Sequence, residues 1–327
     1  MKATDFQPIA ACALRLVRRL LAAGTFVLLA SAASAQTIKV VVPIPAGGAG
    51  DILARVLADH IVRAHGPAMV VENRPGGSTV IGTEAVARAA PDGNTLLIAG
   101  TGFVINPHLR KVNYNPLTSF EPICHLVNLP TVIAVKSSSP YATLADLLDT
   151  ARTKPGQLTL ASIGPASMAH IAFEMLKRAA IADMTFVPFP GTAPALNALL
   201  GDHVTAFFGN YAEVAAHLKV GTLRALASAS PTRIEPLPEL PTLTDLGYRI
   251  ALGEVWYGLL APAKTPKETL SRLAGWFTAA LQAGDVKAKL VSNGTYPAVT
   301  CGADYGAYLR NQSDEYGRAI RDANISP

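Results

Sequence analysis

Short apolar runs alternate with amphipathic segments along most of the chain. The run at 37–44 precedes apolar residues at helical spacing over 51–66, and the run at 68–73 precedes a glycine-rich loop and a helical pattern over 76–90. A further apolar run lies at 95–100. Because strands alternate with helices, the pattern predicts an α/β fold with a doubly wound parallel sheet and right-handed crossovers.

The same alternation continues in the middle of the chain. Residues 236–248 are rich in proline, which indicates an irregular surface connection after this set of segments. The expected strands are 130–137, 158–164, 184–191, 204–210 and 223–230, and the expected helices are 143–156, 167–180, 192–202 and 211–219. These segments predict a second wound sheet.

The C-terminal segments form no obvious domain of their own. They predict a strand and a long helix over 254–284 and a last helix over 304–323. The economical arrangement returns them to the first sheet, so that the chain crosses between the sheets near 122–130 and again near 249–257. A tandem of two independent domains is the alternative. The length of 327 residues, half of them apolar, is enough for two domains.

The N-terminal residues 1–35 have the features of an export signal. Three arginines precede an apolar run near 21–31, and small residues precede an expected cleavage site after Ala35. The apolar run is about a dozen residues long, which is too short to span a bilayer comfortably. A membrane anchor is the disfavoured alternative. We expect an exported protein whose mature chain begins near Gln36.

The charge of the chain argues against nucleic-acid binding. The formal net charge is +5, and the signal segment holds four basic residues and one acidic residue, which is +3 of that total. The remaining chain therefore carries +2 and has no basic tract. No nucleic-acid partner is expected.

Two cysteines, Cys124 and Cys301, remain after the signal segment. An oxidising compartment would permit a disulfide between them. They are distant in the sequence, and nothing in the sequence indicates that they are close in space, so two separate, partly buried thiols are favoured. Because cysteine, histidine and carboxylate residues show no metal-ligand spacing, no metal site is expected.

Small-residue loops follow six of the expected strands. In open α/β sheets, ligands bind beyond the carboxyl ends of the strands, where helix N-termini favour an anion. Glycine also lets the backbone approach a ligand closely. The six loops are "PAGGAGD" at 45–51, "RPGGST" at 74–79, "AGTG" at 99–102, "SIGPAS" at 162–167, "FPGTAP" at 189–194 and "FFGN" at 207–210. The sequence thus favours a cleft that holds a carboxylate.

Signatures of enzymes are weak. Gly48 and Gly50 lack the third glycine of a dinucleotide fingerprint, and neither a phosphate-binding G-x-x-x-x-G-K-[ST] motif nor a G-x-S-x-G elbow is present. Ser167 and His170 are three residues apart on an expected helix and could share a face. An exported Ser–His hydrolase is therefore an alternative, disfavoured because no third orienting group is evident.

Several segments resemble a known family of receptors. "NRPGG", "APDGNTLL" and "WYGLLAPAKTP" occur in family order within about 37–325, and they look like the periplasmic substrate-binding receptors of tripartite tricarboxylate transporters, the Bug-type receptors. The resemblance implies a two-lobed, type II periplasmic-binding-protein (Venus flytrap) fold with crossing hinge strands. The implied first lobe comprises 36–126 and 255–327, and the implied second lobe comprises 127–254.

The resemblance also implies a function without enzyme activity or cofactor. A receptor of this family binds a small organic carboxylate in the cleft between its lobes and delivers it to a membrane permease. We expect a periplasmic monomer. A receptor that signals to a sensor protein is the alternative.

Carried over position by position, the resemblance implies a set of ligand-binding residues. They are Ile44, Ala46, Gly47, Gly48, Asp51, Ser78, Thr79, Thr101, Ser162, Gly164, Ser167, His170, Thr192, Ala193 and Gly209. Asp51 is placed equally well as the N-cap of the following helix, and His170 as a packing residue. The family usually has Asp where Gly209 stands, and such an Asp could pair with the ammonium group of a ligand. The absence of Asp at this position argues mildly against an amino-acid ligand. Trp256 and Tyr257 are expected to pack in the core.

Overall fold

The computed structural model describes residues 37–65, 67–164, 167–250 and 252–326. The predicted export signal at 1–35 lies outside these residues, as does Gly66, the expected end of the first helix. Residue contacts group the chain from Ile38 onward as one compact unit. Within the described ranges, no helix has both the length and the apolar character needed to cross a membrane.

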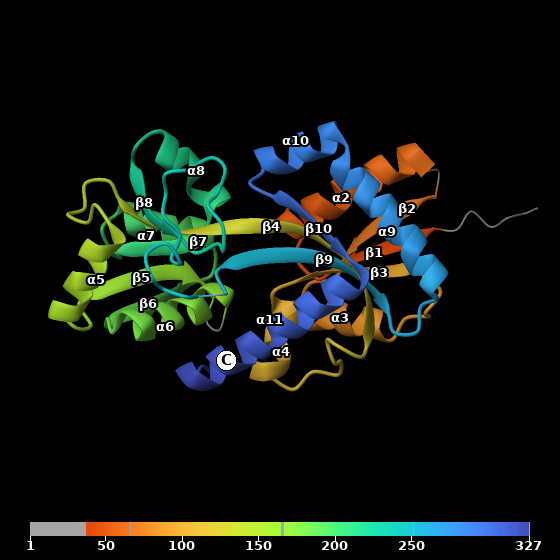
Figure 1. Cartoon of the computed structure of the whole chain (residues 1–327), viewed down its shortest axis with the longest axis horizontal. Helices are drawn as coiled ribbons and strands as arrows, with labels where there is room; N and C mark the ends of the chain where they lie inside the picture. The colour runs from red at the N-terminus through yellow and green to blue at the C-terminus, as the bar shows by residue number, and fades with distance from the viewer. Residues whose placement is uncertain (1–36, 66, 165–166, 251, 327) are drawn as a thin grey trace, which may run out of the picture. The chain divides into compact units, whose positions relative to one another are not determined.

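The first group of strands is parallel and has the order β2-β1-β3 (Figure 1). Its elements are β1 (Ile38–Val42), α2 (Ala49–His65), β2 (Met69–Asn73), the 3₁₀ turn η1 (Gly77–Thr79), α3 (Val80–Ala87), β3 (Thr95–Gly100) and α4 (Gly102–Leu109). Val40 of β1 packs with Leu53 and Leu57 of α2 in a fully buried cluster. The strands and helices expected at 37–100 are confirmed, whereas α4 was not anticipated.

The second group of strands contains the parallel strands β7-β5-β6. Its elements are α5 (Leu144–Thr153), β5 (Leu158–Ile163), α6 (Met168–Ala180), β6 (Met184–Phe189), α7 (Thr192–Leu200), β7 (Ala206–Asn210), α8 (Tyr211–Lys219) and β8 (Leu223–Ser228). Each of these elements falls within a segment that the hydrophobic pattern predicts. The proline-rich connection forms turns and no regular element, as expected.

One long strand, β4 (Phe120–Lys136), connects the two groups (Figure 1). It pairs antiparallel with β9 (Glu254–Pro262) over its first half and with β7 and β8 over its second half. The expectation of two wound sheets joined by crossing strands is therefore confirmed. The expectation of wholly parallel sheets is wrong, because β4 and β9 run antiparallel to their neighbours.

The predicted strand at 130–137 is also too short. Pro122 and Pro130 have no N–H group and would ordinarily mark strand ends. The register of the β4–β9 pair shifts immediately after Pro122, which lets the strand continue past this residue. β4 is buried along most of its length, so its sequence lacks the alternation that marks a half-buried strand.

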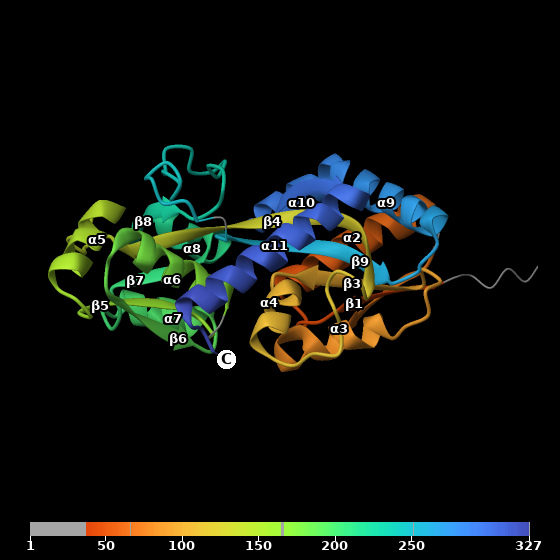
Figure 2. The same cartoon turned by 60° about the horizontal axis from the view of Figure 1, so that its bottom comes forward.

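The C-terminal elements pack against the first group of strands. They are α9 (Lys267–Gln282), α10 (Gly284–Ser292), β10 (Tyr296–Cys301) and α11 (Gly302–Ala323). Phe277 of α9 and Leu290 of α10 belong to the same buried cluster as Ile38, and Figure 2 shows α9 and α10 beside α2. The long helices α9 and α11 were predicted, whereas α10 and β10 were not.

Cys124 of β4 and Cys301 of β10 form a disulfide, with an S–S distance of 2.00 Å. The two residues lie directly opposite each other in the antiparallel pair of these strands. The expectation of two separate thiols is wrong, because the pairing of β10 with β4 brings together residues that are 177 positions apart. The disulfide attaches the start of α11 to the crossing strand.

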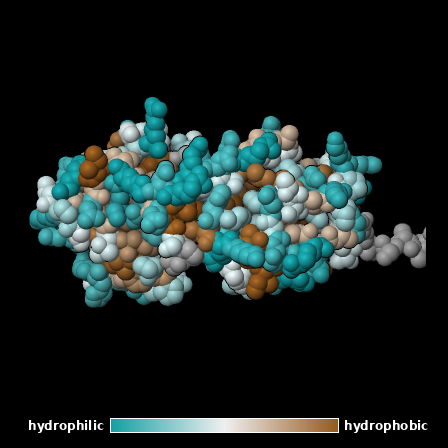
Figure 3. Space-filling view, turned by 90° about the horizontal axis from the view of Figure 1, so that it is seen from below, coloured by the Kyte–Doolittle hydropathy of each residue, from teal (hydrophilic) through white to brown (hydrophobic). Residues whose placement is uncertain are grey.

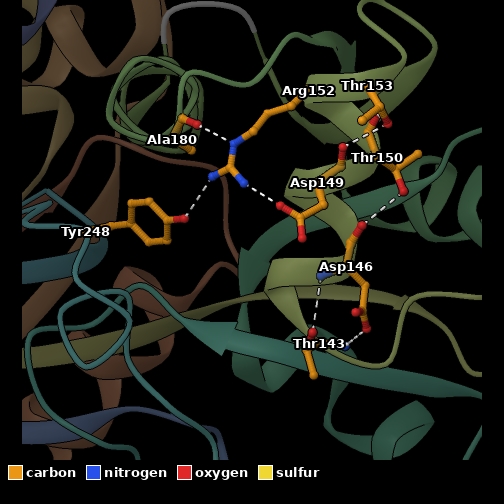
Figure 4. Close-up of polar contacts among 8 residues, drawn as sticks. All are labelled: Thr143, Asp146, Asp149, Thr150, Arg152, Thr153, Ala180 and Tyr248. Atoms are coloured by element: carbon orange, nitrogen blue, oxygen red, sulfur yellow. Dashed lines mark hydrogen bonds and ion pairs between the residues drawn. The ribbon is translucent and has the colours of Figure 1, made fainter.

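The start of α5 illustrates how local sequence determines a helix boundary. Thr143 accepts a hydrogen bond from the Asp146 N–H (3.2 Å), and the Asp146 carboxylate accepts one from the Thr143 N–H (2.9 Å), which is a capping box (Figure 4). Near the other end, the Arg152 Nε donates to the Ala180 carbonyl (2.8 Å). The Arg152 guanidinium also donates to the Tyr248 hydroxyl (3.4 Å), so it connects α5 to α6 and to the end of the proline-rich connection.

Exposed apolar side chains are dispersed. The brown hydrophobic areas in Figure 3 are separate patches within a mostly teal, hydrophilic face. The large apolar side chains that are exposed come from different elements, among them Val70 of β2, Ile181 after α6 and Val220 after α8. On this face the described residues present no continuous apolar band.

Candidate functional site

Two adjoining cavities lie at the carboxyl ends of the parallel strands. The larger, cavity A, has a volume of about 210 Å³ and is lined by Thr101, Thr131, Ser162, Ile163, Ser167, Met168, Ala169, Phe207, Phe208, Gly209, Asn210, Glu213, Val255 and Tyr257. The smaller, cavity B, has a volume of about 100 Å³ and is lined by Val42, Pro43, Ile44, Thr79, Ile98, Gly100, Thr101, Gly102, Val255 and Tyr257. Because Thr101, Val255 and Tyr257 line both cavities, the two spaces share a wall.

Six of the fifteen residues suggested by the sequence line these cavities. Thr101, Ser162, Ser167 and Gly209 line cavity A, and Ile44 and Thr79 line cavity B together with Thr101. The other nine are not among the lining residues: Ala46, Gly47, Gly48, Asp51, Ser78, Gly164, His170, Thr192 and Ala193. The structure therefore brings together residues from four of the six predicted loops, and the loops 45–51 and 189–194 contribute none.

Asp51 organises the loop between β1 and α2. The helix begins at Ala49, so Asp51 lies in its first turn and is not the N-cap that the sequence suggested. Its buried carboxylate accepts hydrogen bonds from the Gly47 N–H (2.9 Å), the Asn73 amide (2.9 Å) and the Arg55 Nε (3.1 Å). Burial raises its pKa, but these partners outweigh burial and hold the pKa below the usual value. The carboxylate is thus already occupied by groups of the protein.

The loop after β2 holds two residues in an unusual backbone conformation. Ser78 and Thr79 have φ angles of 55° and 83°, which lie in the left-handed region of backbone conformation that residues other than glycine rarely adopt. The Asn106 amide donates to the Ser78 carbonyl (2.7 Å) and to the Thr79 hydroxyl (3.3 Å). Since Asn106 is buried in α4, it fixes this loop at the edge of cavity B.

Ser167 and His170 interact as a helix cap. The Ser167 hydroxyl accepts a hydrogen bond from the backbone N–H of His170 (3.2 Å) at the start of α6. The His170 ring stacks on Phe186 with a centroid separation of 4.1 Å, and its Nε2 lies 4.0 Å from the Glu174 carboxylate. Burial lowers the pKa of His170. This arrangement caps and packs the start of α6.

Tyr257 is a central residue of the site, although the sequence analysis expected it to pack in the core. That assignment holds for Trp256, which is fully buried, but Tyr257 lies between the two cavities. Successive residues of a strand point to opposite faces, and this alternation is the signal that could have separated the two aromatic residues. A Cβ atom at Gly50 or Gly100 would lie 2.9 or 3.0 Å from the Tyr257 ring, so both glycines leave room for it.

The Tyr257 hydroxyl stays protonated at neutral pH. Burial raises its pKa to about 12, an effect that the backbone N–H of Gly50 reduces and the charge of Glu213 increases. A phenol that keeps its proton can donate a hydrogen bond to an anion. Tyr257 is therefore a potential donor at the wall between the cavities.

Glu213 is the second residue that sequence reasoning missed. It lines cavity A from the first turn of α8, and its carboxylate accepts hydrogen bonds from the Asn210 N–H (3.1 Å) and the Asn210 side-chain amide (3.1 Å). Burial raises its pKa, and hydrogen bonds from Thr192 and Asn210 reduce this effect. The Asn210–Glu213 spacing is that of an ordinary capping box, so the sequence gives no separate signal for a site.

Among the residues that the structure describes, no group of three or more histidine, cysteine or acidic side chains could hold a metal ion. The polar groups of the two cavities are hydroxyls, an amide and one carboxylate. Such a set suits a small polar organic ligand.

Comparisons with known proteins give one consistent family. The sequence model of the tripartite tricarboxylate transporter family receptor matches residues 53–325. Protein BugT of Bordetella pertussis is 29% identical over 291 residues, which cover 88% of this chain and 89% of that protein.

Two solved structures are also similar. A Rhodopseudomonas palustris protein solved with adipate is 29% identical, with a TM-score of 0.77 and coverage of 89% of this chain and 98% of that one. MatC from the same organism, solved with malate, is 25% identical, with a TM-score of 0.70 and coverage of 87% and 98%.

Proposed function

Because this chain belongs to the tripartite tricarboxylate transporter receptor family, we propose that it is an exported receptor that binds a small organic carboxylate in cavities A and B and delivers it to a membrane permease. The proposal includes removal of residues 1–35 on export. It also includes two lobes, the first comprising 36–126 and 255–327 and the second 127–254.

The observation that carries this proposal is the mixed origin of the wall of cavity A. Thr101 comes from the first group of strands, Ser162 and Asn210 come from the second, and Tyr257 comes from the crossing strand β9. A ligand in this space would contact all three. It would then favour the arrangement in which these elements are close together, which is how a bilobed receptor converts binding into a change of conformation.

Helix N-termini supply the attraction for a carboxylate. α4 begins at Gly102, next to cavity B, and α6 begins directly after Ser167, which lines cavity A. The unpaired N–H groups and the dipole at such termini favour a negative charge. Carboxylates are also what the similar R. palustris structures contain, namely adipate and malate.

Ligand binding is expected to raise the thermal stability of the protein. A ligand that binds only the folded state stabilises it by about 2.7 kcal/mol at a concentration of 100 Kd. For a chain of this size, that corresponds to an increase in Tm on the order of 5 °C. The measurement is differential scanning fluorimetry with mono-, di- and tricarboxylates at millimolar concentration, with inorganic sulfate as a control for general anion effects. A complete absence of shifts across this panel would contradict the proposal.

Delivery to a permease is tested separately from binding. The ligand-loaded receptor is expected to be retained by membranes that contain its permease and to be retained less without ligand. Ligand-dependent capture of a sensor protein, with no retention by the permease, would replace transport with signalling as the role of the same binding site.

A further inference from the structure

Glu213 introduces a negative charge into a cavity that is proposed to bind an anion. Of the described residues that line cavity A, Glu213 is the only charged one. Its carboxylate lies beside Gly209, where an added Cβ atom would come within 2.8 Å of the Glu213 Oε2. A ligand that presented only carboxylate groups to this part of the cavity would therefore face a like charge with no intervening side chain.

Two hydroxyl groups of the cavity wall, those of Ser162 and Thr131, cannot offset this charge for a ligand. The Ser162 hydroxyl donates its proton to the Phe208 carbonyl (2.6 Å), and the Thr131 hydroxyl donates to the Gly253 carbonyl. Both side chains are fully buried, so neither has a free proton to offer the cavity. These two hydroxyls therefore offer the cavity hydrogen-bond acceptors and no donor.

Glu213 also retains capacity to accept a further hydrogen bond. A carboxylate has about four acceptor positions. Asn210 donates two hydrogen bonds to it and Thr192 donates one, which leaves about one position for a ligand. No lysine, arginine or histidine is among the described residues that line the cavity. A partly desolvated carboxylate without a cation is costly, and a cationic group of a ligand would remove that cost.

Potential hydrogen-bond donors also line the site. Thr101 makes no capping hydrogen bond with its hydroxyl, the Gly102 N–H begins α4, and the Tyr257 phenol retains its proton. All three residues line cavity B, and Thr101 and Tyr257 also line cavity A. The site therefore combines potential donors, Thr101, Gly102 and Tyr257, with one acidic acceptor, Glu213.

We propose that the ligand is an amino-carboxylate, whose carboxylate lies toward Thr101 and Tyr257 and whose ammonium group pairs with Glu213. The inference rests on the proposed function, because it names the chemical class of the ligand of the same site. It replaces the expectation, based on Gly209 alone, that an amino-acid ligand is disfavoured. The acidic group sits four positions farther along the chain, on the first turn of α8.

The test compares ligands that differ only in the group that would face Glu213. Isothermal titration calorimetry is carried out with aspartate, malate and succinate, and with 2-aminoadipate and adipate. In at least one of the two series, the amino acid is expected to bind at least tenfold more tightly than the unsubstituted acid, which is succinate for aspartate and adipate for 2-aminoadipate. Aspartate is also expected to bind more tightly than the hydroxy acid malate. Equal or tighter binding of the unsubstituted acids in both series, or a preference for malate over aspartate, would overturn the assignment.

Glu213→Gln provides the second arm of the experiment. Glutamine can also complete a capping box, so the start of α8 is retained while the charge is lost. The variant is expected to lose at least tenfold in affinity for the preferred amine and to bind the unsubstituted acid as well as or better than the unaltered protein. Glu239→Gln, an exposed residue outside both cavities, is the matched control and is expected to change neither affinity.

The outcomes separate this inference from the proposed function. Binding of plain carboxylates with no amine preference, unchanged in Glu213→Gln, would leave the receptor function standing and reject the role of Glu213. Absence of binding by every compound would reject the receptor function and the inference with it. If Glu213→Gln failed to fold, the comparison of matched ligands on the unaltered protein would still decide the question.

Discussion

Gly258→Ala is expected to lower the free energy of unfolding by about 3 kcal/mol, because β9 packs against α11 with no space for a methyl group. A Cβ atom at Gly258 would lie 2.0 Å from the Tyr305 Oη and 2.5 Å from its Cζ, and 3.0 Å from the backbone oxygen of Cys124. Tyr305 is fully buried, and Gly258 pairs with His125 of β4. The substitution must therefore displace either a buried ring or the paired crossing strands. Chemical denaturation measures the change.

The control for this prediction is another glycine in the same part of the chain. Gly275 lies in α9, and a Cβ atom there would meet nothing within 4 Å. Gly275→Ala should therefore raise stability by about 0.5–1 kcal/mol through helix propensity alone. In addition, Tyr305→Phe should recover part of the loss caused by Gly258→Ala, since it removes the atom nearest to the added methyl group. A loss below about 1 kcal/mol for Gly258→Ala, on the scale of ordinary surface substitutions, would contradict the packing described for β9 and α11.

Removal of the disulfide is expected to cost about 4 kcal/mol. Cys124 and Cys301 close a loop with a sequence separation of 177, and a cross-link across so long a loop restricts the unfolded chain strongly. It also holds β10 on β4 at the start of α11. The double variant Cys124→Ala/Cys301→Ala should therefore unfold at a lower denaturant concentration than the oxidised protein.

A reducing agent provides the control for the disulfide. It should lower the stability of the unaltered protein toward that of the double variant and leave the double variant unchanged. A double variant as stable as the oxidised protein, or an unaltered protein insensitive to reduction, would show that the cross-link does not contribute as expected.

The parallel parts of the fold were predictable because their sequence patterns are local. The run before Pro43 and the amphipathic stretch that follows it give β1 and α2 directly, and Thr143 predicts the start of α5. The crossing topology is different. Periodicity indicated two sheets, and the economical return of the C-terminal segments to the first sheet indicated crossings near 122–130 and 249–257. The resemblance to the receptor family also implied crossing strands, and the comparisons confirm that resemblance.

The elements that the sequence did not predict depend on long-range pairing. β10 contains Pro297, has a register irregularity between Pro297 and Thr300, and is half-buried along its whole length, so it lacks a clear strand pattern. Its position opposite β4 determines the disulfide. Neither feature can be derived from the local sequence around Cys301.

The candidate site was predictable at the level of loops and less so at the level of side chains. The glycine-rich loops did lead to the cavities, through Thr101, Ser162 and Gly209. Tyr257 and Glu213 were missed because each has an ordinary structural role in its element, one in a buried strand and the other in a capping box. What makes them relevant is the cavity beside them, which only the folded chain creates.

The most direct test of the central claim is a crystal structure of the protein grown with the tightest-binding compound of the carboxylate panel. The account predicts the ligand in cavities A and B, in contact with Thr101 and Tyr257, with any ammonium group beside Glu213. A ligand bound instead in the larger groove of about 770 Å³ beside the proline-rich connection, with cavities A and B empty, would contradict it.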